Sequence, residues 1–194
     1  VTTVAPSVDN SGMGRTLSMG RDAPLTRGAT TEQIEFDSDD GSYGVAFRHH
    51  ELGYEVDGTP ADCAIAGGLA LDETPDIIVS GCNNGPNAGA SVFGRSGTVS
   101  AAIEAAHLGI PAIAVSSMSF DFERDKFDIE AAFTRELVEY TMANNVFATV
   151  DYLNVLVPAE NLRSVVVTEP ARAHDFRAQI DSTTDEFRFT HRYI

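Results

Sequence analysis

The sequence predicts an α/β fold in which helices cover both faces of a mainly parallel sheet. Short apolar runs alternate with stretches of helical pattern between residues 59 and 157, and this alternation is typical of parallel sheets. The segment from Asp76 to Ser117 has the composition of a strand, a glycine-rich loop, a helix and a second strand. Such a loop, at the carboxyl end of a buried strand, is where open α/β sheets bind their ligands.

The first elements follow from local signals. Val1 to Ala5 is predicted to be a short strand, and the turn composition DSDDGSY of residues 37–43 predicts a β-hairpin. Thr59 is a good N-cap residue for a first helix, with Pro60 at the first helical position and Asp62 at the third, as in a variant capping box. This helix should end near residue 71, and a strand should follow over residues 76–80.

A second helix is expected to begin after its N-cap Ser96 and to end at Gly109, before a buried strand from Ala112 to Ser116. Residues 127–144 have the pattern of an amphipathic helix. Its apolar face should carry the side chains of Ile129, Phe133, Leu137 and Tyr140.

Three more apolar runs complete the prediction. Leu153 to Val157 and Ser164 to Thr168 should be strands, and a last strand is expected within residues 186–194. The expected whole is a three-layer αβα architecture with a β-hairpin extension. The sequence contains no internal repeat. We expect one α/β domain over residues 1–170, and residues 171–194 should begin a C-terminal extension.

The charge balance limits the classes of partner. The formal net charge is −16, and all basic residues except Lys126 are arginine. An acidic surface disfavours nucleic acid, because binding phosphate backbones needs a cationic face. The same composition suits a protein that stays dissolved in concentrated salt, so we expect a halophilic source. The chain has no apolar run of membrane-spanning length and no signal peptide, so a cytoplasmic location is expected, with no membrane partner.

The glycine-rich loop is the candidate site. Ser96, Gly97 and Thr98 have the composition of a phosphate cradle at a helix start, where backbone N–H groups and the helix dipole favour an anion. The alternative is that Ser96 only caps the helix. Asn83 and Asn87 offer hard, neutral oxygens for a divalent metal, or they serve only as residues that tolerate tight turns. Cys63 and Cys82 should be reduced thiols without a metal.

Several segments together resemble the survival protein SurE family of metal-dependent nucleotidases. They occur in the order and spacing of that family and cover most of residues 1–158. The matching segments are VAPSVDNSG (Val4–Gly12), VDGTPADC (Val56–Cys63), PDIIVSGCNNGPNAG (Pro75–Gly89), RSGTVSAAIEAAHLGIPAIAVS (Arg95–Ser116) and LNVLVP (Leu153–Pro158).

The resemblance implies a Rossmann-like α/β fold that hydrolyses nucleoside 5′-monophosphates, and 3′-monophosphates as a second class, with one divalent metal per subunit, Mg²⁺ or Mn²⁺. It assigns Ser11 and Asn83 to the metal. The phosphate pocket is assigned to Asn87, Ser96, Gly97 and Thr98. It also implies a homodimer or homotetramer, with the C-terminal extension as the oligomerisation segment.

In the family, two adjacent aspartates of an N-D-D-G motif also hold the metal, and that motif precedes the VAP segment with which this sequence opens. The chain as given is therefore expected to lack its first strand and this motif, so it has no assigned catalytic residue. Asp39-Asp40-Gly41 lies downstream and is interpreted as a solvated turn. The alternative function is a non-catalytic nucleotide- or phosphate-binding module that has lost its metal site. The upstream sequence discriminates between the two.

Overall fold

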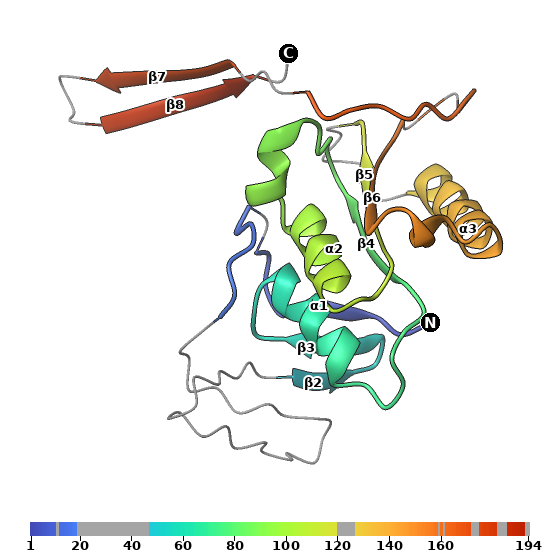
Figure 1. Cartoon of the computed structure of the whole chain (residues 1–194). Helices are drawn as coiled ribbons and strands as arrows, with labels where there is room; N and C mark the ends of the chain where they lie inside the picture. Colours follow the sequence, from blue (N-terminus) through green and yellow to red (C-terminus); the bar gives the residue numbers. More distant parts are fainter. Residues whose placement is uncertain are drawn as a thin grey trace.

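The computed structural model (Figure 1) describes residues 1–10, 12–18, 47–119, 127–158, 160, 162–171, 175–181 and 186–192. The predicted hairpin around residues 37–43 lies outside these residues, as does Asp39-Asp40-Gly41. The described elements are β1 (Val4–Pro6), β2 (Phe47–His50), β3 (Gly53–Val56), α1 (Pro60–Leu69), β4 (Ile78–Asn83), the 3₁₀ helix η2 (Ala90–Gly94), α2 (Gly97–His107), β5 (Ala112–Ser117), α3 (Asp128–Ala143), the 3₁₀ helix η3 (Val146–Ala148), β6 (Tyr152–Val157), β7 (Asp175–Asp181) and β8 (Glu186–Arg192).

The strands are mainly parallel, as predicted, and they form separate sheets. One three-stranded sheet has the order β4-β5-β6 and is parallel throughout. The other has the order β1-β3-β2, in which only β2 runs antiparallel to its neighbour. A third pair, β7 and β8, is an antiparallel hairpin that projects away from the body of the molecule (Figure 1).

β5 lies at the centre of three layers, and all of its residues are buried. Alternate side chains of a strand point to opposite faces of the sheet. On one face, Ala112 and Ala114 pack with residues of α2. On the other face, Ile113 and Val115 pack against α3. The αβα architecture is therefore confirmed around β5, and Figure 1 shows α2 and α3 on opposite sides of β5.

The first helix begins where its capping signals predict. The Thr59 side chain accepts a hydrogen bond from the Asp62 backbone N–H, and the Asp62 carboxylate accepts one from the Thr59 N–H, which completes a capping box. α1 ends at Leu69, two residues before the predicted end. Its buried side chains Cys63 and Ala66 form a small core with Phe47 and Val56 from β2 and β3. The β2–β3 hairpin was not predicted.

Three predictions are wrong in part: the apolar face of α3 and the bounds of the strands β1 and β4. Tyr140 is 61% exposed, whereas Val138 packs in the core cluster beneath α3. The buried face of α3 shifts toward Val138 in its later turns, because Phe147 of η3 packs against the same cluster. The first strand is Val4–Pro6 rather than Val1 to Ala5, and the strand predicted at 76–80 is Ile78–Asn83.

The strand predicted from Ser164 to Thr168 does not form. Residues 162–171 have no regular secondary structure, and Val165, Val166 and Val167 are 70%, 73% and 96% exposed. High β-propensity is realised only when a neighbouring strand supplies hydrogen bonds and a packed face. No strand in the described part of the chain pairs with this segment, so its valines remain in contact with solvent.

Burial raises the pKa of the Cys63 thiol to about 12, from an ordinary value of 9.0, and the nearby Asp62 carboxylate adds to the rise. Above pH 9.0 the thiol ionises in the unfolded chain, but it stays protonated in the folded chain until about pH 12. Because only the unfolded chain releases this proton in that range, we expect the free energy of unfolding to fall as the pH rises from 9.0 toward 12. Denaturant titrations of the wild type and Cys63→Ala should show a smaller alkaline loss in the variant. Equal alkaline losses of stability in the two proteins would contradict a raised pKa for the Cys63 thiol.

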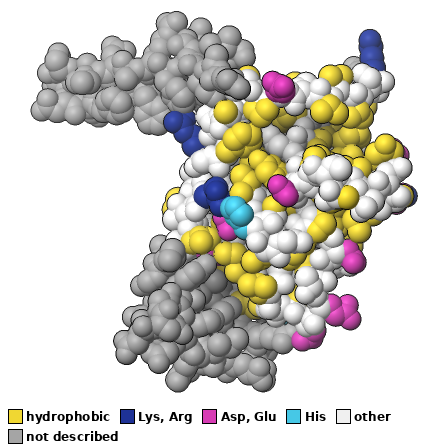
Figure 2. Space-filling model, viewed as in Figure 1, with side chains coloured by type: hydrophobic (Ala, Val, Ile, Leu, Met, Phe, Trp, Pro, Cys, Tyr) yellow, Lys and Arg dark blue, Asp and Glu magenta, His cyan; other side chains and the backbone are white. Residues whose placement is uncertain are grey.

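No helix among the described residues is long and apolar enough to cross a bilayer. On the face shown in Figure 2, acidic side chains are scattered singly among neutral residues, and basic side chains are few. This distribution accords with the net charge of −16.

Candidate functional site

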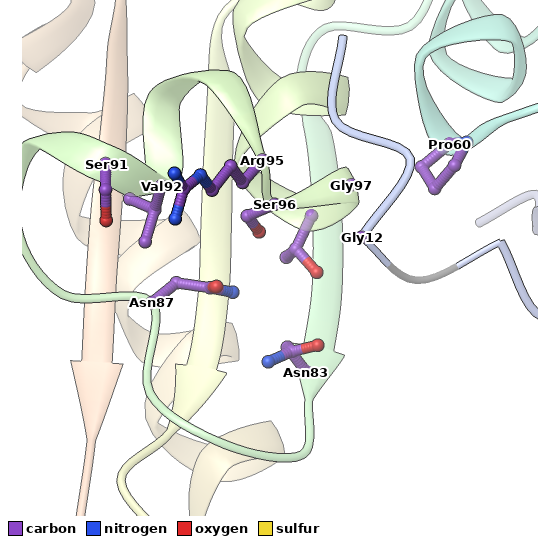
Figure 3. A pocket seen from close by; sticks show the side chains of 10 residues that line it. Gly12, Pro60, Asn83, Asn87, Ser91, Val92, Arg95, Ser96 and Gly97 are labelled. Carbon is purple, nitrogen blue, oxygen red and sulfur yellow. The ribbon is translucent and has the colours of Figure 1, made fainter. Parts of the chain in front are cut away.

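A cavity of about 250 Å³ lies where the end of β4, the loop after it and the start of α2 meet (Figure 3). α1 contributes its first residue to the wall, and the loop after β1 contributes Gly12. The residues that line the cavity are Gly12, Pro60, Asn83, Asn87, Ser91, Val92, Arg95, Ser96, Gly97 and Thr98. The cavity therefore lies at the carboxyl end of a parallel strand, which is the usual ligand position in open α/β sheets.

Asn83 is the last residue of β4, and the backbone before it determines its position. The register between β4 and β5 shifts between Ser80 and Asn83. Gly81 has a φ of +126°, and a Cβ at this position would lie 2.3 Å from the Val115 carbonyl oxygen. The Asn83 amide nitrogen donates to the Gly85 carbonyl at 2.7 Å. In Figure 3 its Oδ1 and Nδ2 point to opposite sides, and the oxygen is the atom suited to a cation.

Asn87 lies in the loop after β4 and is only 8% exposed. Its Nδ2 donates to the Ser116 hydroxyl on β5 at 2.9 Å, and its backbone carbonyl accepts a hydrogen bond from Asn154 Nδ2 on β6 at 3.0 Å. The loop is therefore anchored to two neighbouring strands. An amide nitrogen carries two protons, so one N–H of Asn87, which lines the cavity, is not used by the bond to Ser116.

The start of α2 supplies the hydrogen-bond donors of the site. The Ser96 hydroxyl accepts the Val99 N–H at 3.2 Å, so Ser96 caps the helix while its own proton remains available to a ligand. The N–H groups of Gly97 and Thr98 precede the first intrahelical hydrogen bond, so no carbonyl of the helix accepts them. A Cβ on Gly97 would lie 2.7 Å from Pro60 Cγ, so glycine also allows α1 and α2 to approach closely here.

The loop of residues 12–18 closes the side of the site near α1. The Asp62 carboxylate, 1% exposed, accepts hydrogen bonds from the Ser18 N–H at 3.2 Å and from the Ser18 hydroxyl at 2.7 Å. The Thr59 hydroxyl also lies 2.7 Å from the Thr16 carbonyl. The capping box of α1 therefore both starts the helix and holds this loop.

The other end of the same loop is held against α2. Gly14 has a φ of +61°, and a Cβ there would lie 2.3 Å from the Gly94 carbonyl oxygen. Next to it, the Arg15 guanidinium donates to the Glu104 carboxylate at 2.7 Å. Close backbone contact and an ion pair thus fix the loop beside the cavity.

The comparisons with known proteins agree with this geometry. The family model for Survival protein SurE matches residues 1–177. The chain belongs to the SurE family.

Individual relatives support the same assignment. The chain is 42% identical to a protein named 5′-nucleotidase SurE from Natronomonas pharaonis, with 95% of this chain and 67% of that protein covered. It is 41% identical to the protein of that name from Halobacterium salinarum, with 92% and 63% covered. The chain thus spans about two thirds of the length of these relatives. The crystal structure of the SurE protein from Aquifex aeolicus matches with a TM-score of 0.70 at 27% identity, covering 97% of this chain and 70% of that one.

This SurE-family fold brings most of the predicted site residues together. Asn83, Asn87, Ser96, Gly97 and Thr98 all line the one cavity. Ser11 lies outside the described residues, although its neighbour Gly12 lines the cavity.

Sequence reasoning did not single out several residues that shape this SurE-family site. Ser116 and Asn154 anchor Asn87, although they lie far from it in sequence. Arg95 lines the cavity directly. Its signal was present, because Arg95 immediately precedes the Ser96-Gly97-Thr98 motif.

The donor set of this SurE-family cavity fits a divalent metal only in part. Asn83 Oδ1 is a hard oxygen of the kind that Mg²⁺ and Mn²⁺ accept. None of the lining residues is an aspartate or glutamate, and the described residues contain no cluster of three or more His, Cys, Asp or Glu side chains that could hold a metal. The lining residues therefore supply neutral oxygens and no carboxylate to balance the charge of a divalent ion.

Proposed function

We propose that this chain is part of a metal-dependent phosphomonoesterase that hydrolyses nucleoside 5′-monophosphates, and 3′-monophosphates as a second class, to nucleoside and phosphate. The main support is one observation: a hard oxygen from Asn83 and a set of phosphate-type donors at the start of α2 line the same cavity. The name 5′-nucleotidase carried by the relatives supports the choice of substrate.

The chain's own residues would bind and orient the phosphate group. The Gly97 and Thr98 N–H groups, with the hydroxyls of Ser96 and Thr98, are placed to donate to its non-bridging oxygens. Asn87 adds its second amide proton. These donors are fixed before substrate arrives, so they can stabilise charge that develops on the phosphate during hydrolysis without reorganising.

A divalent metal, when bound, would neutralise phosphate charge and lower the pKa of a bound water. We propose Asn83 and Ser11 as neutral ligands of this metal. Asn83 is the better supported of the two. Its amide nitrogen donates to the Gly85 carbonyl, which leaves its side-chain oxygen to bind the metal.

The deciding experiment is release of inorganic phosphate by the protein with its native termini, from a panel of nucleoside 5′- and 3′-monophosphates. Chelator should abolish release, and added Mg²⁺ or Mn²⁺ should restore it. Tight nucleotide binding without phosphate release under every metal condition would instead identify a binding module.

Asn83→Ala tests the proposed ligand. We expect the variant to bind Mn²⁺ roughly tenfold or more weakly, measured by electron paramagnetic resonance titration, and to need correspondingly more metal for activity. Asn144→Ala is the matched control, because Asn144 is an exposed amide residue that ends α3. Equal Mn²⁺ affinities of the two variants would contradict a ligand role for Asn83.

We also propose that the protein is cytoplasmic, that it is adapted to high salt, and that it assembles as a homodimer or homotetramer. Light scattering on the purified protein tests the oligomeric state, and a monomer would contradict that part.

A further inference from the structure

We propose that Arg95 is a substrate-binding residue whose guanidinium group binds the phosphate of the anionic ester. This inference rests on the proposed function and adds a cation to the donors at the start of α2. Nothing in the Ser96-Gly97-Thr98 motif itself requires a charged residue at this position.

The local fold places Arg95 at the cavity. Its backbone N–H donates to the Val92 carbonyl at 3.2 Å, which ties it to the last turn of η2. The next residue, Ser96, is the N-cap of α2. The Arg95 side chain is exposed and also lines the cavity. In Figure 3 it runs from the start of α2 toward Val92, on the same side of the cavity as the amide of Asn87.

The residues that line the cavity carry no negative charge, although the molecule as a whole is acidic. Helix α2 has no acidic residue in its first turn, and none of the lining residues is acidic. The positive end of the helix dipole and the Arg95 guanidinium therefore act together. Both are positive, so an anion bound between them would be stabilised by both.

The net charge of −16 makes such a local cation important. A nucleoside monophosphate is itself an anion, and the overall field of the protein opposes its approach. A guanidinium at the cavity offsets this repulsion where the phosphate binds. Arginine suits the role better than lysine, because its planar fork can donate two parallel hydrogen bonds to a phosphate.

The size of the cavity is consistent with this role. Its volume of about 250 Å³ is below the range of about 300–1,000 Å³ that is usual for sites enclosing a whole small molecule. The phosphate end of the ester should enter, and the nucleoside should remain near the mouth. An exposed side chain that also lines the cavity can bind the phosphate as it enters.

The test compares Arg95→Ala and Arg95→Lys with Arg163→Ala in the protein with its native termini. Arg163 is an exposed arginine that lines a different groove, beside α3. Binding of inorganic phosphate and of the nucleoside alone is measured by calorimetry, and KM and kcat are measured for the nucleoside monophosphate. We expect Arg95→Ala to weaken phosphate binding and raise KM by about ten- to a hundredfold. Arg95→Lys should show a smaller loss.

Further results are expected from the same variants. Nucleoside binding should be unchanged in Arg95→Ala, and Arg163→Ala should match the wild type in every measurement. The melting temperature of Arg95→Ala should show that the variant is folded under the binding conditions, so that a loss of phosphate binding is not a loss of the fold. The loss of phosphate binding should persist at high salt, where a long-range field effect would be screened.

Unchanged phosphate binding in Arg95→Ala would overturn the inference, even if the wild type hydrolyses the ester. Equal losses in Arg95→Ala and Arg163→Ala would also overturn it, by indicating a general charge effect. Loss of nucleoside binding would assign Arg95 to the base instead. A wild type that binds phosphate through Arg95 and releases none from the ester would refute the proposed function and leave this inference standing.

Discussion

Replacing Gly81 by alanine is expected to lower the free energy of unfolding by about 3–5 kcal/mol. Its φ of +126° is a conformation that residues with a side chain rarely adopt. The added Cβ would also lie 2.3 Å from the Val115 carbonyl oxygen, and that oxygen belongs to the central strand β5. Neither the strain nor the clash can be relieved by turning a side chain.

Gly94→Ala is the matched control, because a Cβ at Gly94 meets no atom within 4 Å. Denaturant titration of both variants measures the difference, and Mn²⁺ titration reports on Asn83, which lies two residues after Gly81. We expect Gly81→Ala to lose metal affinity under conditions where it is still folded. Equal stability of the two alanine variants would show that the backbone at Gly81 can relax without cost.

Replacing Asp62 by alanine is expected to cost about 3 kcal/mol of folding free energy. The Asp62 carboxylate accepts hydrogen bonds from the N–H and hydroxyl of Ser18 and from the N–H and hydroxyl of Thr59. Without it, two buried N–H groups lose their acceptor, and α1 loses half of its capping box. The loop of residues 12–18 also loses its main attachment near the cavity.

Asp57→Ala is the control for this experiment, because Asp57 is exposed and lies just before the same helix. Hydrogen exchange at the Ser18 amide should accelerate strongly in Asp62→Ala and stay unchanged in Asp57→Ala. Asp62→Asn should be intermediate, since the amide retains one oxygen acceptor. Unaltered Ser18 exchange in Asp62→Ala would mean that other contacts hold the loop.

Much of the central fold could be predicted because its signals are local. The Thr59 capping box and the Ser96 N-cap depend on hydrogen bonds between residues three apart. The strand β5 could be recognised because it is apolar on both faces. These interactions form wherever the short segment forms, so the residue types alone indicate them.

The strand prediction at Ser164 to Thr168 failed for the opposite reason. Three consecutive valines favour extended backbone, but a strand also needs a partner, and the sequence does not specify which edge is available. The β2–β3 hairpin shows the reverse case, because its residues FRHH and GYEV have no strong alternation and yet pair in register. Tyr140 likewise lies on the predicted face of α3 but outside the packed contact.

The sequence by itself determined where α1 and α2 begin, that the strand after α2 is buried, and that Ser96, Gly97 and Thr98 stand at a helix start with Arg95 before them. Only the tertiary structure decided how Asn87 is held beside this helix start and that the loop of residues 12–18 meets it. The hydrogen bonds that gather them join residues far apart in the chain, 44 positions for Ser18 and Asp62 and 67 for Asn87 and Asn154. Such contacts form only after the strands and helices have packed, so no local pattern encodes them.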